Sequence, residues 1–253
     1  YHPTCNVTTV EVYLAARHPD VYADLIAQVA DCRTYKTKAG ESIVVPEKGL
    51  LPGEDEKAFD INKPNDNKRC RASQFIQHTL VNGFYQTGRC KPSGTVVGKD
   101  YQYILGPQTY RTEQYNDPKY GLVTVRIKES EDKLVDGKGQ AVLNSLGKPC
   151  DNPNVTPTDV VTISEMVLGY KMPYIDAPYQ VTNKPWVFDL PDAARLLKYK
   201  QDGNLPLGVP TLAGQHVQTI HDVFVAANGQ CWVFIDNQNG EDEDGWVTLQ
   251  ELH

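Results

Sequence analysis

The most strongly patterned part of the chain is its C-terminal section, where two runs of β-forming residues follow each other closely. The runs HVQTIHDVFV and CWVFID are joined through AANG, which ends in Asn228 and Gly229. Asn-Gly between runs rich in β-branched and aromatic residues is typical of a tight hairpin. The sequence therefore predicts an antiparallel strand pair over 216–236.

The N-terminal section has helical periodicity instead. Over 5–17, apolar residues recur at helical spacing, at Val7, Val10 and Leu14, and Pro19 ends the run. Further helices are predicted over 20–31, 70–82, 158–168 and 191–201, and the helix over 70–82 is expected to end at Gly83. Short strands are predicted over 95–105 and 121–128. Helices followed by strands indicate an α+β fold.

The middle of the chain shows little periodicity. Residues 34–69 are rich in Lys, Glu, Asp, Gly and Pro, and we interpret them as a long surface excursion that faces substrate. Loop signals also recur through about 85–157, so both stretches are interpreted as insertions or loops. With 253 residues the chain can bury one full core, and we expect 1–253 to be a single domain.

The charge balance narrows the range of partners. The formal net charge is -7 and no dense Lys or Arg run is present, so the basic patch that nucleic acid needs is missing. No apolar stretch approaches the roughly 20 residues that cross a bilayer. We expect no nucleic-acid partner and no membrane span. The start at Tyr1 rather than Met suggests a processed mature form or a trimmed chain. We expect the protein to be secreted or extracellular.

The six cysteines lack the paired spacing of a zinc ribbon or a thioredoxin-like motif. The acidic run 241–244 lacks the ligand spacing of a calcium loop and is interpreted as a solvated turn. We therefore expect no metal and no cofactor. Cys70 and Cys90 bracket a predicted helix and a turn, and they are the expected disulfide pair. Cys70 also heads that helix, which makes it a rival to Cys5 as a nucleophile.

Cys5 stands at the start of the first predicted helix. The positive end of the helix dipole favours a thiolate, and a nearby imidazolium would lower the pKa of the thiol further. The Cys5 backbone N–H is free at the first helical turn and points to where a tetrahedral oxyanion would form. This placement suits acyl transfer with Cys5 as nucleophile and its own N–H as an oxyanion donor.

A base and a group that orients it would have to come from the C-terminal hairpin. Asp236 is the orienting candidate, and His216 and His221 are the candidate bases. A two-residue turn at Asn228 and Gly229 would set His221 opposite Asp236, whereas a bulge or a longer loop would bring His216 there. Both histidines stay open at this point.

Three motifs resemble the bacteriocin-processing-peptidase-like branch of the papain-like cysteine peptidases. They are CNVTTVEVYL at 5–14, GQHVQTI at 214–220 and VFIDNQNG at 233–240. The resemblance implies a papain-like fold, with helices headed by the nucleophile, a C-terminal antiparallel sheet and a long inserted middle. It also implies that 205–211 is the strand leading to the histidine loop. Relatives carry a Gln several residues before the cysteine, and here only four residues precede Cys5.

By that resemblance Cys5 is the nucleophile, His216 is the general base and acid, and Asp236 orients the imidazole. The implied function is that of a cysteine peptidase, which cleaves an amide bond in a peptide or protein through a thioester. The same residues would serve a peptidoglycan amidase, a deamidase or a transglutaminase-like effector or toxin, with an inhibitor or immunity protein as a further partner. A different alternative is a non-catalytic, disulfide-stabilised extracellular binding domain.

Overall fold

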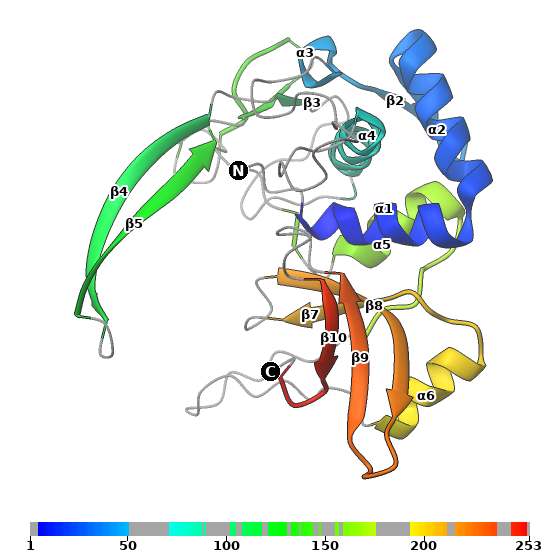
Figure 1. Cartoon of the computed structure of the whole chain (residues 1–253). Helices are drawn as coiled ribbons and strands as arrows, with labels where there is room; N and C mark the ends of the chain where they lie inside the picture. The colour runs from blue at the N-terminus through cyan, green and yellow to red at the C-terminus, as the bar shows by residue number, and fades with distance from the viewer. Residues whose placement is uncertain are drawn as a thin grey trace.

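The computed structural model describes residues 5–50, 71–87, 89, 102–104, 108–117, 121–130, 133–136, 138–143, 147, 155–156, 159–175, 193–211, 216–236 and 244–251. Within these ranges the chain combines α-helices with antiparallel strands (Figure 1). The predicted α+β class is confirmed at this level. No described helix is both long and apolar enough to cross a membrane.

The helical half of the molecule is built around one buried helix. Its principal helices are α1 (Cys5–Arg17), α2 (Pro19–Cys32), α4 (Arg71–Gln86) and α5 (Asp159–Leu168). Helix α4 packs against each of the other three, and α1 also packs against α2 and α5. The predicted break at Pro19 is confirmed, because α1 ends at Arg17 and Pro19 opens α2.

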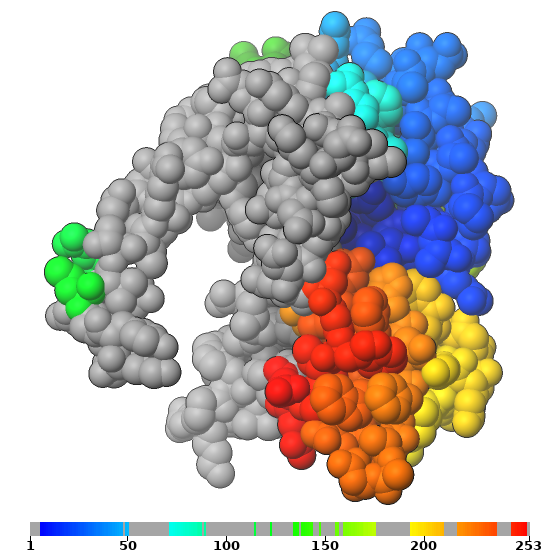
Figure 2. All heavy atoms as spheres, viewed as in Figure 1, coloured from blue at the N-terminus to red at the C-terminus, as the bar shows by residue number. Residues whose placement is uncertain are grey.

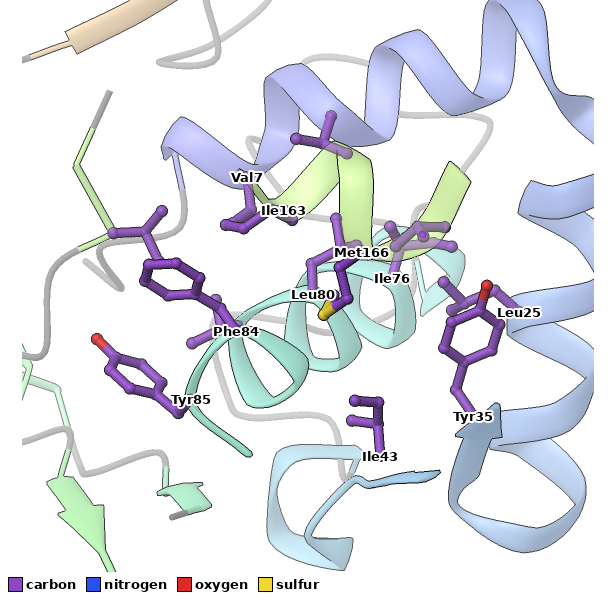
Figure 3. Close-up of a cluster of buried hydrophobic side chains, with 14 of the residues drawn as sticks. Val7, Leu25, Tyr35, Ile43, Ile76, Leu80, Phe84, Tyr85, Ile163 and Met166 are labelled. Atoms are coloured by element: carbon purple, nitrogen blue, oxygen red, sulfur yellow. The ribbon is translucent and has the colours of Figure 1, made fainter. Parts of the chain in front are cut away.

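The core between these helices contains the apolar side chains that gave α1 its periodicity. Val7, Val10 and Leu14 are fully buried, and Ile163 and Met166 of α5 join them (Figure 3). Burying a side chain of this size stabilises the fold by about 1.5–3 kcal/mol. The apolar stripe of the sequence is therefore the stripe that holds α1 in place.

Part of the predicted surface excursion 34–69 lies in the core instead, so that interpretation is wrong for its first half. Strands β1 (Thr34–Lys36) and β2 (Ser42–Val44) form an antiparallel pair, and the short helix α3 (Glu47–Leu50) follows. Four apolar residues of this stretch are buried among the helices: Tyr35, Ile43, Val45 and Leu50. They are isolated in a polar sequence, so no periodicity indicated that they would be buried.

The third predicted helix was expected to end at Gly83, but α4 continues through Gly83 to Gln86. A Cβ at position 83 would lie 2.7 Å from both Sδ and Cε of Met166, and 3.2 Å from Cδ1 of Ile43. The glycine is thus needed for close packing rather than for a C-cap. Residue Cys70 and the rest of 51–70 lie outside the described residues.

The second half of the molecule is a four-stranded antiparallel sheet with the order β10-β9-β8-β7. Its strands are β7 (Leu207–Thr211), β8 (His216–Val225), β9 (Cys231–Asp236) and β10 (Gly245–Thr248). Helix α6 (Ala193–Gln201) and helix α1 both pack against β8. The predicted strands of the C-terminal hairpin are confirmed, and so is the strand expected within 205–211.

The two faces of this sheet belong to different cores. Val217 of β8 is buried with the α1 residues of the helical core. Ile220, Val223 and Leu196 of α6 form a second apolar cluster with the buried residues of β7 and β9. Because side chains alternate along a strand, one face of the sheet packs on α1 and the opposite face on α6.

The remaining strands form two separate pairs in the inserted middle. Strand β3 (Gln102–Ile104) pairs with β6 (Lys133–Val135), and β4 (Gln108–Asp117) pairs with β5 (Gly121–Ser130). The β4–β5 pair projects from the body as a long arm (Figure 1). The strand predicted over 121–128 is confirmed as β5, and only 102–104 of the predicted strand 95–105 lies within the described residues.

The close approach of α1 to the sheet can be tested at Gly208 of β7. A Cβ there would lie 2.9 Å from Cγ2 of Thr9 and 2.9 Å from Cδ2 of Tyr174. We predict that Gly208→Ala lowers the free energy of unfolding by about 1–3 kcal/mol, because α1 and the Tyr174 ring must move apart. Chemical denaturation measures the change.

Gly83→Ala is the matched control, because the added methyl group meets the flexible Met166 side chain rather than a constrained one. The alanine also gains about 1 kcal/mol of helix propensity. We expect a clearly smaller loss than for Gly208→Ala. Equal losses would contradict the close approach of α1 to β7.

Candidate functional site

The N-terminal end of α1 is anchored by a buried hydrogen bond next to Cys5. The Asn6 Nδ2 donates to the backbone oxygen of Val155 at 2.5 Å, and Asn6 is buried. Asn6 begins an Asn-Val-Thr triplet, the acceptor pattern of N-glycosylation, but the buried and hydrogen-bonded Nδ2 leaves no room for a glycan. Cys5 is the first residue of α1 as predicted, but its side chain lies outside the described residues.

A buried carboxylate holds the middle of α1 against α4. The Glu11 Oε2 accepts hydrogen bonds from Ser73 Oγ at 2.8 Å and from Gln77 Nε2 at 2.7 Å. The Tyr22 hydroxyl of α2 donates to the other carboxylate oxygen at 3.3 Å. Hydrogen bonds to a charged group are stronger than neutral ones, so this network sets the position of α1 along α4.

A row of three residues, here called the cross-strand row, crosses the sheet beneath α1. Thr219 of β8 pairs with Gly208 of β7 on one side and with Asp236 of β9 on the other. Directly opposite residues of an antiparallel sheet lie on the same face. The Gly208 end of the row meets Thr9 of α1, so Asp236 belongs to the face that packs on this helix.

The register of the β8–β9 hairpin differs from the predicted two-residue turn. Val225 pairs with Cys231, which makes the connecting loop longer, and the register shifts again between Ile220 and Asp222. His221 is the extra residue of this β-bulge. Asp236 therefore stands opposite Thr219, and neither His221 nor His216 is its backbone partner.

The bulge nevertheless brings the His221 side chain to Asp236. The His221 Nε2 lies 3.5 Å from the Asp236 Oδ2, and the two side chains are 31% and 30% exposed. The Nε2 atom is buried and makes no hydrogen bond to any described residue, because 3.5 Å is too long for an ordinary N–H···O bond. A small approach of the two groups would turn this contact into a hydrogen bond.

His216 is placed differently. It is the first residue of β8 and pairs with Thr211 of β7, on the side of the strand away from β9. Its side chain lies outside the described residues, as do Cys70 and Cys90, so the predicted disulfide is not described either. Of the candidate residues, the structure brings together His221 and Asp236.

The other titratable groups near this hairpin have roles of their own. The Lys200 Nζ of α6 lies 2.6 Å from the Asp222 Oδ1 and, by its hydrogen bond, lowers the pKa of the Asp222 carboxyl. Burial raises the pKa of the Cys231 thiol in β9. Cys32, at the end of α2, is exposed, and neither cysteine is in a disulfide. Among the described residues, no group of three or more His, Cys, Asp or Glu could hold a metal ion.

Four aromatic residues beside His221 were not recognised from the sequence. Phe224, Trp232, Phe234 and Trp246 occupy one face of β8, β9 and β10. The alternation of CWVFID, with buried residues at 231, 233 and 235, could have revealed the two of them on β9. The strand β10, which carries Trp246, was not predicted.

The anchor of α1 can be tested at Asn6. We predict that Asn6→Ala lowers the free energy of unfolding by about 1–3 kcal/mol, because the buried Val155 oxygen loses its donor. Gln28→Ala is the control, since its side chain donates to Asp24 and accepts from the Lys36 backbone N–H in exposed hydrogen bonds. It should change stability by about 0.5 kcal/mol or less. A neutral Asn6→Ala in thermal or chemical unfolding would contradict the anchoring role.

Comparisons with known proteins add nothing to this geometry. No protein-family model, no curated protein and no solved structure matches the chain. The function must therefore be argued from α1, the cross-strand row and the His221–Asp236 pair.

Proposed function

We propose that the chain is a cysteine hydrolase that cleaves an amide bond, with a papain-like arrangement of a nucleophile helix and a C-terminal sheet. Cys5 is the nucleophile, His221 is the general base and acid, and Asp236 orients the imidazole. The observation that carries the proposal is the His221–Asp236 pair on the sheet face against which α1 packs.

Helical periodicity supports the placement of Cys5. Thr9 meets Gly208 of the cross-strand row, and position 5 is one helical turn before position 9 on the same side of α1. The same row ends at Asp236. The start of α1 and the His221–Asp236 pair thus belong to the same side of the sheet.

The choice of His221 over His216 rests on its contact with Asp236. The sequence motif favours His216, but His216 pairs with β7, whereas the bulge directs His221 toward Asp236. With Nε2 turned to the carboxylate, the other ring nitrogen, Nδ1, is the one available to a thiol. A cysteine–histidine pair with an orienting acid requires one ring nitrogen to face the acid and the other to face the thiol.

The chemistry follows from these roles. His221 takes the proton of the Cys5 thiol, and the thiolate attacks the amide carbon, while the oxyanion is bound by the Cys5 backbone N–H. The imidazolium protonates the leaving amine as the carbon–nitrogen bond breaks, which leaves a thioester. His221 then deprotonates a water molecule that attacks the thioester, and the carboxylate product and the thiol are released. A peptide or protein is the proposed substrate.

The nucleophile can be identified by alkylation with iodoacetamide at about pH 6, where a thiolate of lowered pKa reacts and ordinary thiols scarcely do. We predict that Cys5 is labelled selectively in peptide maps. Cys32 is the internal control for an exposed thiol, and Cys231 for a buried thiol of raised pKa. Labelling at Cys70, or at Cys5 no faster than at Cys32, would contradict the proposal.

The base can be identified by comparing two histidine variants in the same assay. We predict that His221→Ala reduces the rate of Cys5 labelling and of peptide hydrolysis by at least about 100-fold, the usual contribution of a general base. His216→Ala is the matched control on the same strand. If the two effects are reversed, His216 is the base and the motif is the better guide. If neither variant has an effect, neither histidine is the base and the proposed triad is wrong.

A further inference from the structure

The sheet carries an exposed group of aromatic rings that no packing of the described residues explains. This aromatic face consists of Phe224 on β8, Trp232 and Phe234 on β9, and Trp246 on β10. Trp232 pairs with Phe224, and Trp246 pairs with Phe234, so all four lie on one side of the sheet. Figure 2 shows the last strands, coloured orange to red, at the surface of the molecule.

The rings form a continuous series. Trp246 makes edge-on contacts with Phe224 at 5.0 Å and with Phe234 at 5.5 Å between ring centroids. Phe224 and Trp232 are nearly parallel, with centroids 6.4 Å apart. Such pairs support one another, so the aromatic face is a preformed surface rather than a set of independent side chains.

The aromatic face is open to solvent although its residues are large and apolar. Trp246 is 44% exposed and Phe224 is 41% exposed. A contiguous exposed apolar patch on a globular protein usually marks a binding site, and Trp and Phe are enriched at the centres of such sites. The patch therefore points to a ligand that covers it.

The aromatic face begins at the proposed catalytic pair. The His221 ring lies edge-on to Phe234, with centroids 6.3 Å apart. Asp236 is two residues beyond Phe234 on the same strand, and hence on the same face. A substrate bound at His221 would extend directly over the rings.

Carboxylates flank the aromatic face. Asp236 ends β9 and Asp244 is exposed immediately before β10. The whole chain has a formal net charge of -7, which favours a cationic partner. Aromatic faces attract Lys and Arg side chains, and nearby carboxylates attract them further.

We propose that the aromatic face binds a basic and apolar segment of the peptide substrate, with Lys or Arg side chains lying over Trp246 and Phe224. This inference rests on the proposed function, because it makes the aromatic face the substrate-binding surface of the same site. The Lys or Arg stem packs on the rings while its charged end turns to the carboxylates. A neutral sugar chain would use the rings but not the carboxylates.

The test is calorimetric titration of the Cys5→Ala protein, which binds without turnover. The probe is an acetylated and amidated peptide of alternating leucine and lysine, about six residues long, compared with the same peptide carrying glutamine for lysine and with an N-acetylglucosamine oligomer. We expect the lysine peptide to bind at least about tenfold more tightly than either. Trp246→Ala should weaken its binding by about tenfold or more.

Tyr170→Ala is the matched control, because Tyr170 is 45% exposed and lies just beyond α5, where its ring contacts His18. It should leave the binding of the lysine peptide unchanged. Asp244→Asn removes the charge and keeps the size of the side chain. It should weaken binding of the lysine peptide alone, an effect that added salt should reproduce. This variant keeps the test decisive if Trp246→Ala does not fold.

Equal binding of the lysine and glutamine peptides, or tighter binding of the sugar oligomer, would overturn the proposal. So would unchanged binding in both Trp246→Ala and Asp244→Asn. These outcomes are independent of catalysis, because the titration uses a protein without the Cys5 thiol. A chain that binds the lysine peptide but shows no selective Cys5 labelling would retain the aromatic face as a peptide site and lose the hydrolase function.

Discussion

The close approach of α1 to the C-terminal sheet is the contact on which the rest of the structure depends. Gly208 has no side chain, so Thr9 and Tyr174 pack directly on its backbone. A larger residue would lift α1 away from β7 and β8, and Val217 would lose its place in the helical core. The hydrogen bonds of Asn6 and Glu11 hold the same helix from its other sides. The start of α1 is thereby fixed relative to the strand ends.

The bulge at His221 is the second feature that shapes the proposed site, because it changes the register between β8 and β9. It absorbs one residue of β8, so that Thr219 rather than His221 pairs with Asp236, and yet the imidazole reaches the carboxylate. Bulges commonly redirect a side chain next to a functional site. Here the same bulge lies where the α1-covered part of the sheet gives way to the exposed aromatic face. The proposed catalytic pair and the proposed substrate-binding surface therefore share one structural origin.

Periodicity alone predicts the parts of this fold whose stability comes from a regular apolar stripe. Val7, Val10 and Leu14 lie in the core as α1 requires, and the alternation in CWVFID matches the burial of β9. Isolated apolar residues such as Tyr35 and Ile43 carry no period, so β1 and β2 were interpreted as surface. A bulge or a longer loop was one of two alternatives that the sequence left open, and the sequence could not decide between them because the hairpin register depends on packing against α1 and α6. Asp236 could be chosen from sequence, but its contact with His221 required the structure.

The central claim is that the His221 imidazolium and the dipole of α1 together keep the Cys5 thiol ionised. The ultraviolet absorbance of the thiolate measures this directly, as the difference between the native chain and Cys5→Ser over a pH titration. The account predicts that the Cys5 thiolate forms well below the ordinary range of a cysteine thiol, and that Asp236→Asn changes its titration. A Cys5 thiolate that forms only in the ordinary range, with no response to Asp236→Asn, would contradict it.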